Sequence, residues 1–351
     1  MRTATMMLSI LLAGCASTPA PRAADAGVAA VDALMADYAG NVPGASVLVL
    51  KHGEPVVRRS YGMADLEAGI PATPATNYRL ASVSKQFTSA AVLLLVEDGT
   101  VALDAPVRRW LPELPAVAGQ VTVRHLLTHT SGLVDYEEVM DPDPPRQLRD
   151  ADVLAILAGV DHAYFPAGSD YRYSNSGYAL LALIVERASG MDYPAFLAER
   201  IFRPLGMDAT LAYTREGPAV PNRAYGHSRV DGAWVRTDQS STSAVLGDGG
   251  VYSSIDDLAR WDASLYDDRL LPDALRELAF SAATPTDDPE VQYGFGWRIT
   301  GERLWHSGET IGFRNVLVRW PGEELTVVVL TNRNHPEPYP LALRIAEHFR
   351  D

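Results

Sequence analysis

The chain has 351 residues, of which 47% are hydrophobic and 21% charged, a composition typical of a globular protein with a sizeable core. Its formal net charge of −14 argues against a nucleic-acid partner, because phosphate binding requires a basic face and none is visible. No apolar stretch reaches about eighteen residues, so the sequence predicts no transmembrane helix.

The first element is a predicted signal segment rather than part of the fold. An apolar run from Met6 to Ala13 ends in the box Leu12-Ala13-Gly14-Cys15, which resembles that of bacterial lipoproteins. We therefore expect residues 1–14 to be a signal peptide, and residues 15–25 to be a lipidated Cys15 on a flexible tether. An ordinary secretory cleavage site is the alternative. Cys15 is the only cysteine, which excludes an internal disulfide.

Patterns at the two ends of the chain predict a single sheet built from both ends. Apolar residues at helical spacing predict a helix over 25–39, and residues 338–349 predict a closing helix. The predicted strands are Ala45–Lys51, Pro55–Met63, Tyr293–Thr300, Arg303–Ser307, Phe313–Trp320 and Leu325–Thr331. Residues 26–81 and 245–351 would supply the sheet, with a mostly helical insertion over about 100–240.

A serine and a lysine stand one turn apart at the start of a helix predicted over Ser82–Glu97. The chain contains only two lysines, Lys51 and Lys85, and Lys85 closes the segment Ser82-Val83-Ser84-Lys85. A desolvated lysine can be a neutral amine, which can take the proton of the serine hydroxyl and make it a nucleophile. The bland alternative is a helix-capping serine beside a solvated lysine.

Two later segments complete a pattern. Tyr173-Ser174-Asn175 precedes a helix predicted over 175–188, and His306-Ser307-Gly308 ends a predicted strand. Taken alone, Tyr173 would be a packing aromatic and His306 a hydrogen-bonded sheet residue. In this order after Ser82, the segments resemble the three motifs of the serine β-lactamase and penicillin-binding protein superfamily. The tyrosine is more similar to class C β-lactamases, serine DD-peptidases and their esterase relatives.

The resemblance covers residues 26–351 and implies an α/β fold. Its parts would be an antiparallel sheet flanked by N- and C-terminal helices and an all-helical lobe, with the active site between them. It also implies catalytic roles: Ser82 is the nucleophile and Lys85 its activator. Tyr173 would carry a proton between them and the leaving group, and Asn175 would orient Lys85 and bind the substrate amide.

In the same resemblance, the third motif is a strand edge beside the substrate. His306 is the remaining catalytic residue, Ser307 and Gly308 bind substrate, and the N–H of Glu309 would be the second oxyanion donor after that of Ser82. Class C β-lactamases commonly carry lysine at the position of His306. Histidine is mostly neutral at pH 7 and binds a carboxylate less firmly, unless falling pH protonates it. Arg314 would replace the lost charge if it points into the cleft.

Two further patterns are not interpreted as sites. His125 and His129 are four residues apart, but the segment between them lacks the glutamate of the zinc-protease motif. The run Gly247-Asp248-Gly249-Gly250 lacks the lysine of a phosphate loop and predicts a turn at the rim of the cleft. We therefore expect neither a metal nor another cofactor.

The sequence thus predicts a serine hydrolase that forms a covalent intermediate at Ser82. Its expected substrates are small esters or D-amino-acid amides and peptides, with poor turnover of penicillins and cephalosporins. The alternatives are a β-lactamase or DD-carboxypeptidase proper and a non-catalytic envelope binding module. An α/β-hydrolase is disfavoured, because no Gly-x-Ser-x-Gly occurs.

The expected location is the bacterial cell envelope, facing the periplasm on a lipid anchor. Ala16 follows Cys15 in place of the aspartate associated with inner-membrane retention, which favours the outer membrane in a Gram-negative cell. A peptidoglycan-type peptide would then be within reach.

Overall fold

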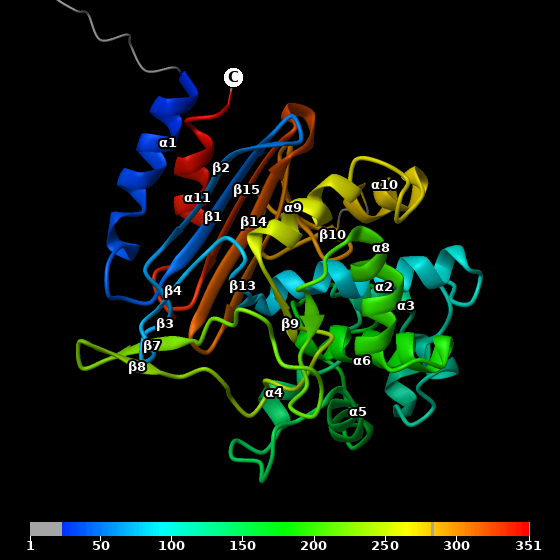
Figure 1. The fold of residues 1–351 in the computed structure, drawn as a ribbon. Helices are drawn as coiled ribbons and strands as arrows, with labels where there is room; N and C mark the ends of the chain where they lie inside the picture. Colours follow the sequence, from blue (N-terminus) through cyan, green and yellow to red (C-terminus); the bar gives the residue numbers. More distant parts are fainter. Residues whose placement is uncertain (1–22, 282–283, 351) are drawn as a thin grey trace, which may run out of the picture.

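The computed structural model describes residues 23–281 and 284–350, which are organised around an eight-stranded antiparallel sheet (Figure 1). The strand order is β10-β11-β12-β13-β14-β15-β1-β2. The strands are β1 (Ala45–Lys51), β2 (Glu54–Tyr61), β10 (Thr284–Pro285), β11 (Gln292–Tyr293), β12 (Arg298–Thr300), β13 (Arg303–Thr310), β14 (Phe313–Trp320) and β15 (Leu325–Thr331). β1 pairs with β15 along its full length, which confirms the predicted sheet built from both ends of the chain.

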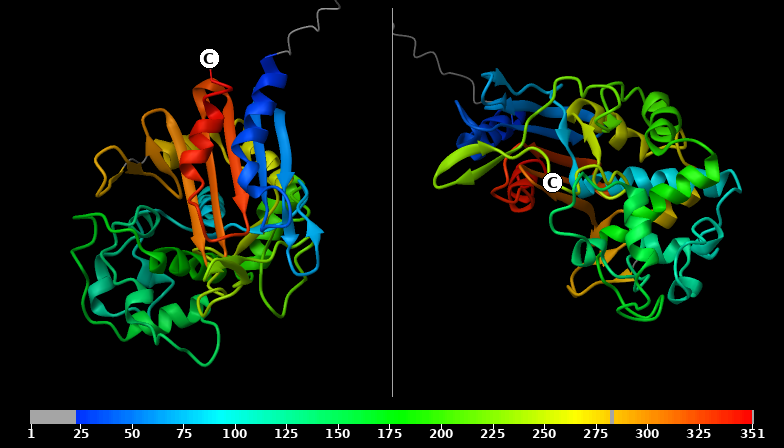
Figure 2. Two further views of the ribbon diagram at one scale, coloured as in Figure 1. Left: turned by 90° about the vertical axis from the view of Figure 1, so that its left-hand side faces the viewer. Right: turned by 90° about the horizontal axis from the view of Figure 1, so that it is seen from below.

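Both faces of the central strands are covered. Val47 and Val49 of β1 pack in one core with helices α1 (Ala23–Leu34) and α11 (Tyr339–Ala346), which lie side by side over that face (Figure 2). Leu48 and Leu50 point the other way, into the core shared with the helical lobe. Because side chains alternate between two buried faces, the middle of these strands is largely apolar instead of alternating with polar residues.

The helical lobe is centred on α2 (Lys85–Glu97) and α6 (Asn175–Ser189), which contact each other. A short 3-10 turn, η2 (Ala81–Ser84), leads into α2. The other helices are α3 (Val123–Leu127), α4 (Tyr136–Val139), α5 (Asp150–Ala158), α7 (Tyr193–Leu197), α8 (Arg203–Leu205), α9 (Ile255–Ser264) and α10 (Asp273–Ser281), with single turns η1 (Ala36–Tyr38), η3 (Val107–Arg109), η4 (Ala116–Gln120), η5 (Ala198–Phe202) and η6 (Pro321–Glu323). In the described part of the chain, no helix is both long and apolar enough to cross a membrane.

Small strands also occur, and several of them interrupt the region predicted to be mostly helical. They are β3 (Met63–Asp65), β4 (Ile70–Pro71), β5 (Tyr78–Arg79), β6 (Leu211–Ala212), β7 (His227–Val230), β8 (Ala233–Arg236) and β9 (Val251–Ser253). β7 and β8 form a hairpin whose turn residues, Asp231 and Gly232, both have positive φ. An Asp-Gly pair is a strong signal for such a turn, so the sequence contained the information that the helical prediction overlooked.

The strand predicted over Tyr293–Thr300 is broken into β11 and β12. Between them the chain turns at Gly296, which has a φ of +77°. A β-carbon there would lie 2.7 Å from the carbonyl oxygen of Lys85 and 2.8 Å from the hydroxyl of Ser89. Glycine therefore allows this turn to pack directly on the first turn of α2.

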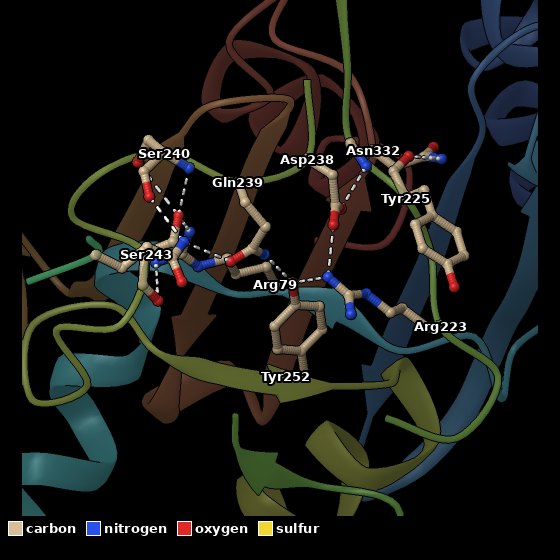
Figure 3. A network of polar contacts seen from close by, with 11 residues as sticks. Arg79, Arg223, Tyr225, Asp238, Gln239, Ser240, Ser243, Tyr252 and Asn332 are labelled. Atoms are coloured by element: carbon tan, nitrogen blue, oxygen red, sulfur yellow. Dashed lines mark hydrogen bonds and ion pairs between the residues drawn. The ribbon is translucent and has the colours of Figure 1, made fainter. Parts of the chain in front are cut away.

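A network of polar contacts extends from Arg79, shortly before η2, to Asn332, which follows β15 (Figure 3). Arg79 on β5 is buried and donates to the hydroxyl and the carbonyl oxygen of Ser243. Farther along the network, buried Asn332 follows β15 and donates to the carbonyl oxygens of Met63, Ala64 and Tyr225 at 2.9–3.1 Å. One amide thereby connects three separate segments.

We expect Asn332→Ala to lower the free energy of unfolding by about 1–3 kcal/mol, because it removes a fully buried amide that donates to three carbonyls. Asn334→Ala is the matched control. Its side chain accepts one bond, from the N–H of Arg229, and it should cost less than about 1 kcal/mol. Urea denaturation measures both variants, and equal losses would contradict this account of Asn332.

Candidate active site

Ser82 lies in η2, one turn before α2 begins at Lys85. The preceding residue, Ala81, has a φ of +51°, a left-handed conformation that costs an alanine about 1–2 kcal/mol. Such strain is maintained only where the surrounding structure fixes the backbone, and it is common at functional sites. The residue at the N-cap of α2 is Ser84, whereas the hydroxyl of Ser82 lies 3.0 Å from Nζ of Lys85, so Ser82 is not the helix cap that the alternative supposed.

The amine of Lys85 is fully buried and has three oxygen neighbours. Nζ lies 3.0 Å from the hydroxyl of Ser82, 2.8 Å from the amide oxygen of Asn175 and 2.8 Å from the carbonyl oxygen of Asp248. All three neighbours are uncharged. The arrangement presents a desolvated amine directly to a serine hydroxyl, as the sequence predicted, and excludes a surface lysine.

The turn from Gly247 to Gly250 holds the third acceptor in place. Buried Asp150 accepts from the N–H groups of Leu246 and Gly247, both at 3.0 Å, and the hydroxyl of Thr88 donates to the carbonyl oxygen of Gly247 at 2.6 Å. This turn was predicted at the rim of the cleft, but it forms the buried back wall behind Lys85. The sequence showed a turn, and nothing in it showed what the turn contacts.

Tyr173 and Asn175 reach the same amine from the start of α6. The ring centroid of Tyr173 lies 5.0 Å from Nζ of Lys85. The backbone N–H of Asn175 donates to Asp135 at 2.6 Å, and its side-chain NH₂ donates to Glu137 at 3.2 Å. These bonds orient the amide so that its oxygen faces Lys85.

β13 passes beside the catalytic turn because Gly308 has no side chain. A β-carbon there would collide with the carbonyl oxygen of Leu80, immediately before η2. Alternation along β13 puts His306 on the same face as Gly308, and the side chains of Ser307 and Glu309 on the opposite face. The third motif is thus adjacent to Ser82 through its backbone and through His306.

His306 is buried and neutral. Its Nδ1 lies 2.6 Å from the carbonyl oxygen of Ser307, which only accepts, so we assign the hydrogen to Nδ1 and let Nε2 accept from the hydroxyl of Tyr293 at 2.9 Å. Burial, with the charges of Arg298 and Lys85, holds the pKa of His306 well below its usual 6.5. Falling pH is therefore not expected to protonate His306 near pH 6, and carboxylate binding by a charged His306 loses its support.

Arg314 pairs with a neighbouring strand, and Arg298, which the sequence did not single out, lies beside Tyr173. Arg314 forms an ion pair with Glu309, its cross-strand neighbour, and donates to the carbonyl oxygens of Thr310 and Phe313. Arg298 on β12 instead lies over the ring of Tyr173 at 5.4 Å, and its buried Nε has no hydrogen-bond partner among the described residues. The broken strand that aims Arg298 at Tyr173 had no sequence signal beyond Gly294 and Gly296.

His125 and His129 make separate hydrogen bonds. Nδ1 of His125 accepts from the N–H of Thr122 at 3.3 Å in the N-cap of α3. His129 is buried beside Tyr173, and its Nδ1 accepts from the N–H of Ser174 at 3.2 Å. Their side chains therefore contact different parts of the helical lobe.

A strained serine turn beside a buried lysine, between a helical lobe and an antiparallel sheet, defines the chain as a serine hydrolase of the Ser-x-x-Lys type. A family model described as beta-lactamase matches residues 28–349. The protein belongs to the beta-lactamase family.

Its relatives are named for related activities. It is 34% identical to penicillin-binding protein 4* of Bacillus subtilis, over 87% of this chain and 71% of that protein. It is 32% identical to the D-aminopeptidase of Gluconobacter oxydans, over 87% of this chain but only 58% of that enzyme. Its structure is similar to that of the D-amino acid amidase from Ochrobactrum anthropi SV3, with a TM-score of 0.80, 27% identity and coverage of 92% of this chain and 98% of that one.

We expect the ring of His306 to remain neutral from about pH 5.5 to 8.5, because its pKa is held well below 6.5. NMR of the imidazole should show no titration in this range, with the His306→Gln variant used to assign the signal. Histidines of the urea-unfolded protein, which titrate near 6.5, are the reference. A midpoint near 6.5 in the folded protein would contradict the assignment.

Proposed function

We propose that the protein hydrolyses small esters or D-amino-acid amides and peptides through a covalent intermediate at Ser82. The observation that carries the proposal is the buried Lys85 amine, 3.0 Å from the hydroxyl of Ser82 and surrounded by neutral acceptors. An amine within hydrogen-bond distance of the hydroxyl is placed to accept its proton.

In the proposed reaction, the neutral amine of Lys85 takes the hydroxyl proton while Oγ of Ser82 bonds to the acyl carbon. The tetrahedral intermediate then breaks its bond to the leaving group, whose oxygen or nitrogen receives the proton through the hydroxyl of Tyr173. Water attacks the resulting ester, gives its proton back along the same route and restores the Ser82 hydroxyl as the acid leaves. Each transfer by a positioned group of this kind contributes about 10²–10⁴ in rate.

We assign the oxyanion site to the backbone N–H groups of Ser82 and Glu309. The close approach of Gly308 to Leu80 supports this assignment, because it brings the backbone of β13 beside the turn that carries Ser82. Losing one such donor typically costs about 10²–10³ in rate. His306, fixed by Tyr293, would keep this strand in register, and Ser307, whose side chain lies on the opposite face, would contact substrate through its backbone.

The names of the relatives support substrates that contain D-amino acids. Arg298, a cation beside Tyr173, also favours acyl compounds with a carboxylate, and this observation makes a DD-carboxypeptidase the second candidate. A β-lactamase is the third, and it is disfavoured because a neutral His306 stands where efficient class C enzymes carry a permanent charge. The absence of any adduct at Ser82 would leave only the non-catalytic binding module.

We expect Ser82→Ala to abolish the adduct that a fluorophosphonate forms with the wild-type protein, because the nucleophile is gone. Lys85→Ala should reduce turnover of a p-nitrophenyl ester by about 10³ or more, since the pair acts as a unit. Lys51→Ala replaces the other lysine, far from the site in the β1–β2 hairpin, and should leave turnover unchanged. The measurements are the adduct masses and kcat/KM. Labelling that persists in Ser82→Ala would contradict a covalent intermediate at Ser82.

The same assay ranks substrates. We expect kcat/KM for a p-nitrophenyl ester, a D-amino-acid amide or a D-Ala-D-Ala peptide to exceed the value for a cephalosporin. A cephalosporin value far above the others would show a β-lactamase instead.

We further propose a lipid-anchored location in the cell envelope, with residues 1–14 removed, Cys15 lipidated and the catalytic domain beginning near residue 26. Residues 1–22 lie outside the described part of the structure, so only the sequence supports this proposal. The lipoprotein box is the supporting feature. The anchor would hold the domain within reach of peptidoglycan peptides and periplasmic small molecules.

We expect Cys15→Ser to release the protein from the membrane fraction or to leave it unprocessed, because the acyl chains attach to the thiol. Fractionation and intact mass of the purified protein test this. A wild-type protein that is soluble and carries no fatty acid would refute the anchor.

A further inference from the structure

His129 adopts a strained conformation in the buried wall of the site. It is 2% exposed, and its φ is +58°, in the left-handed region that residues with a β-carbon seldom occupy. Such strain persists only where the surrounding contacts fix the backbone. The ring of His129 also packs on Tyr178 and Tyr293, but its hydrogen bonds to other parts of the site are with the segment that carries Tyr173.

Two hydrogen bonds to His129 bracket Tyr173 in the sequence. The carbonyl oxygen of His129 accepts from the N–H of Arg172 at 3.0 Å, and its Nδ1 accepts from the N–H of Ser174 at 3.2 Å. Between these bonds, the imidazole packs on the ring of Tyr173, with centroids 4.3 Å apart and planes inclined by 36°. One residue therefore holds the backbone on both sides of Tyr173 and supports its side chain.

The bond to Ser174 also fixes the protonation of the imidazole. A backbone N–H only donates, so Nδ1 carries no hydrogen, and the neutral ring is protonated at Nε2. A second proton would occupy Nδ1 and break the bond. Burial, together with the nearby charges of Lys85 and Arg298, holds the pKa of His129 well below 6.5, so the ring remains an acceptor at neutral pH.

We propose that His129 is the positioning residue of Tyr173, holding its phenol where it can pass a proton to the leaving group. The inference rests on the proposed role of Tyr173 and adds the residue through which the protein controls it. Loss of His129 should therefore affect substrates in proportion to their need for that proton. An amide nitrogen must be protonated to leave, whereas p-nitrophenolate leaves without a proton.

Three substitutions of His129 separate its effect on the position of Tyr173 from the effect of its strained backbone. His129→Gly removes the ring and the acceptor but tolerates the positive φ, whereas His129→Ala removes the same groups and keeps the strain. The two should share one kinetic defect, with the alanine variant melting at a lower temperature. His129→Asn keeps a side-chain acceptor near the position of Nδ1 and accepts the left-handed backbone, so its defect should be smaller.

The test compares kcat/KM for an amide and a p-nitrophenyl ester with the same D-amino acyl group. We expect His129→Gly to lose about 100-fold on the amide and less than about fivefold on the ester, with a loss of about tenfold on the amide for His129→Asn. Tyr173→Phe should show the same preference. His125→Asn, in α3 and bonded to Thr122, is the control and should leave the amide-to-ester ratio unchanged.

A double variant makes the assignment specific. If His129 acts through the phenol, Tyr173→Phe with His129→Gly should be no slower than Tyr173→Phe alone, within about twofold. Losses that multiply, or equal losses on ester and amide in the His129 variants, would overturn the inference. An unchanged ratio in Tyr173→Phe would overturn the role of Tyr173 itself, and so distinguishes failure of the proposed function. Should His129→Gly not fold, His129→Asn and its double variant decide by the same criteria.

Discussion

The buried amine of Lys85 is the constraint on which the rest of the site depends. An amine without water requires hydrogen-bond acceptors, and those of Lys85 come from three parts of the chain far apart in sequence, at Ser82, Asn175 and Asp248. Meeting that requirement fixes where α6 begins and where the Gly247–Gly250 turn passes. The acceptors are themselves held by further hydrogen bonds. Asp150 and Thr88 bind the Gly247–Gly250 turn, and Asp135 binds the backbone of Asn175.

Around this amine the protein keeps its other titratable groups close to neutral. Burial raises the pKa of Asp248 to about 8 and that of Asp150 to about 7, although the charge of Lys85 acts against the shift at Asp248. Burial also keeps His129 and His306 uncharged. The Asp248 carboxyl is therefore mostly protonated at pH 7 and does not give the lysine a full counter-ion. A weakly charged surrounding suits the role proposed for Lys85, which is to take and return a proton during turnover.

Sequence reasoning located the elements that have strong local signals. β1, β14 and β15 have the predicted bounds, because long apolar strands between turns are readable without tertiary information, and Ser82, Lys85 and Asn175 meet as expected. It did not predict burial depth or the direction of long side chains.

His306 lies in a strand, as expected, but its burial was not predicted. The alternation of side chains along a strand does not tell whether a face meets solvent or a second layer. The direction of Arg314 was left open and Arg298 was not singled out for the same reason, since their partners come from a strand pairing and a glycine break. His129 was read for metal-ligand spacing, while its actual bonds depend on a left-handed backbone and on Ser174, 45 residues later.

The pairing of β1 with β15 has a consequence for how the site is assembled. The catalytic turn lies in the first third of the chain, but the strand that completes it, β13, is held in a sheet that closes only through β15. Contacts between such distant segments form late, because a long loop must be closed before they stabilise anything. During synthesis, a chain that already contains Ser82, Lys85 and Tyr173 therefore lacks β13, the strand to which we assign an oxyanion donor. Reactivity toward acyl groups should appear only when the last strand is in place, which protects an unfinished chain from acylation.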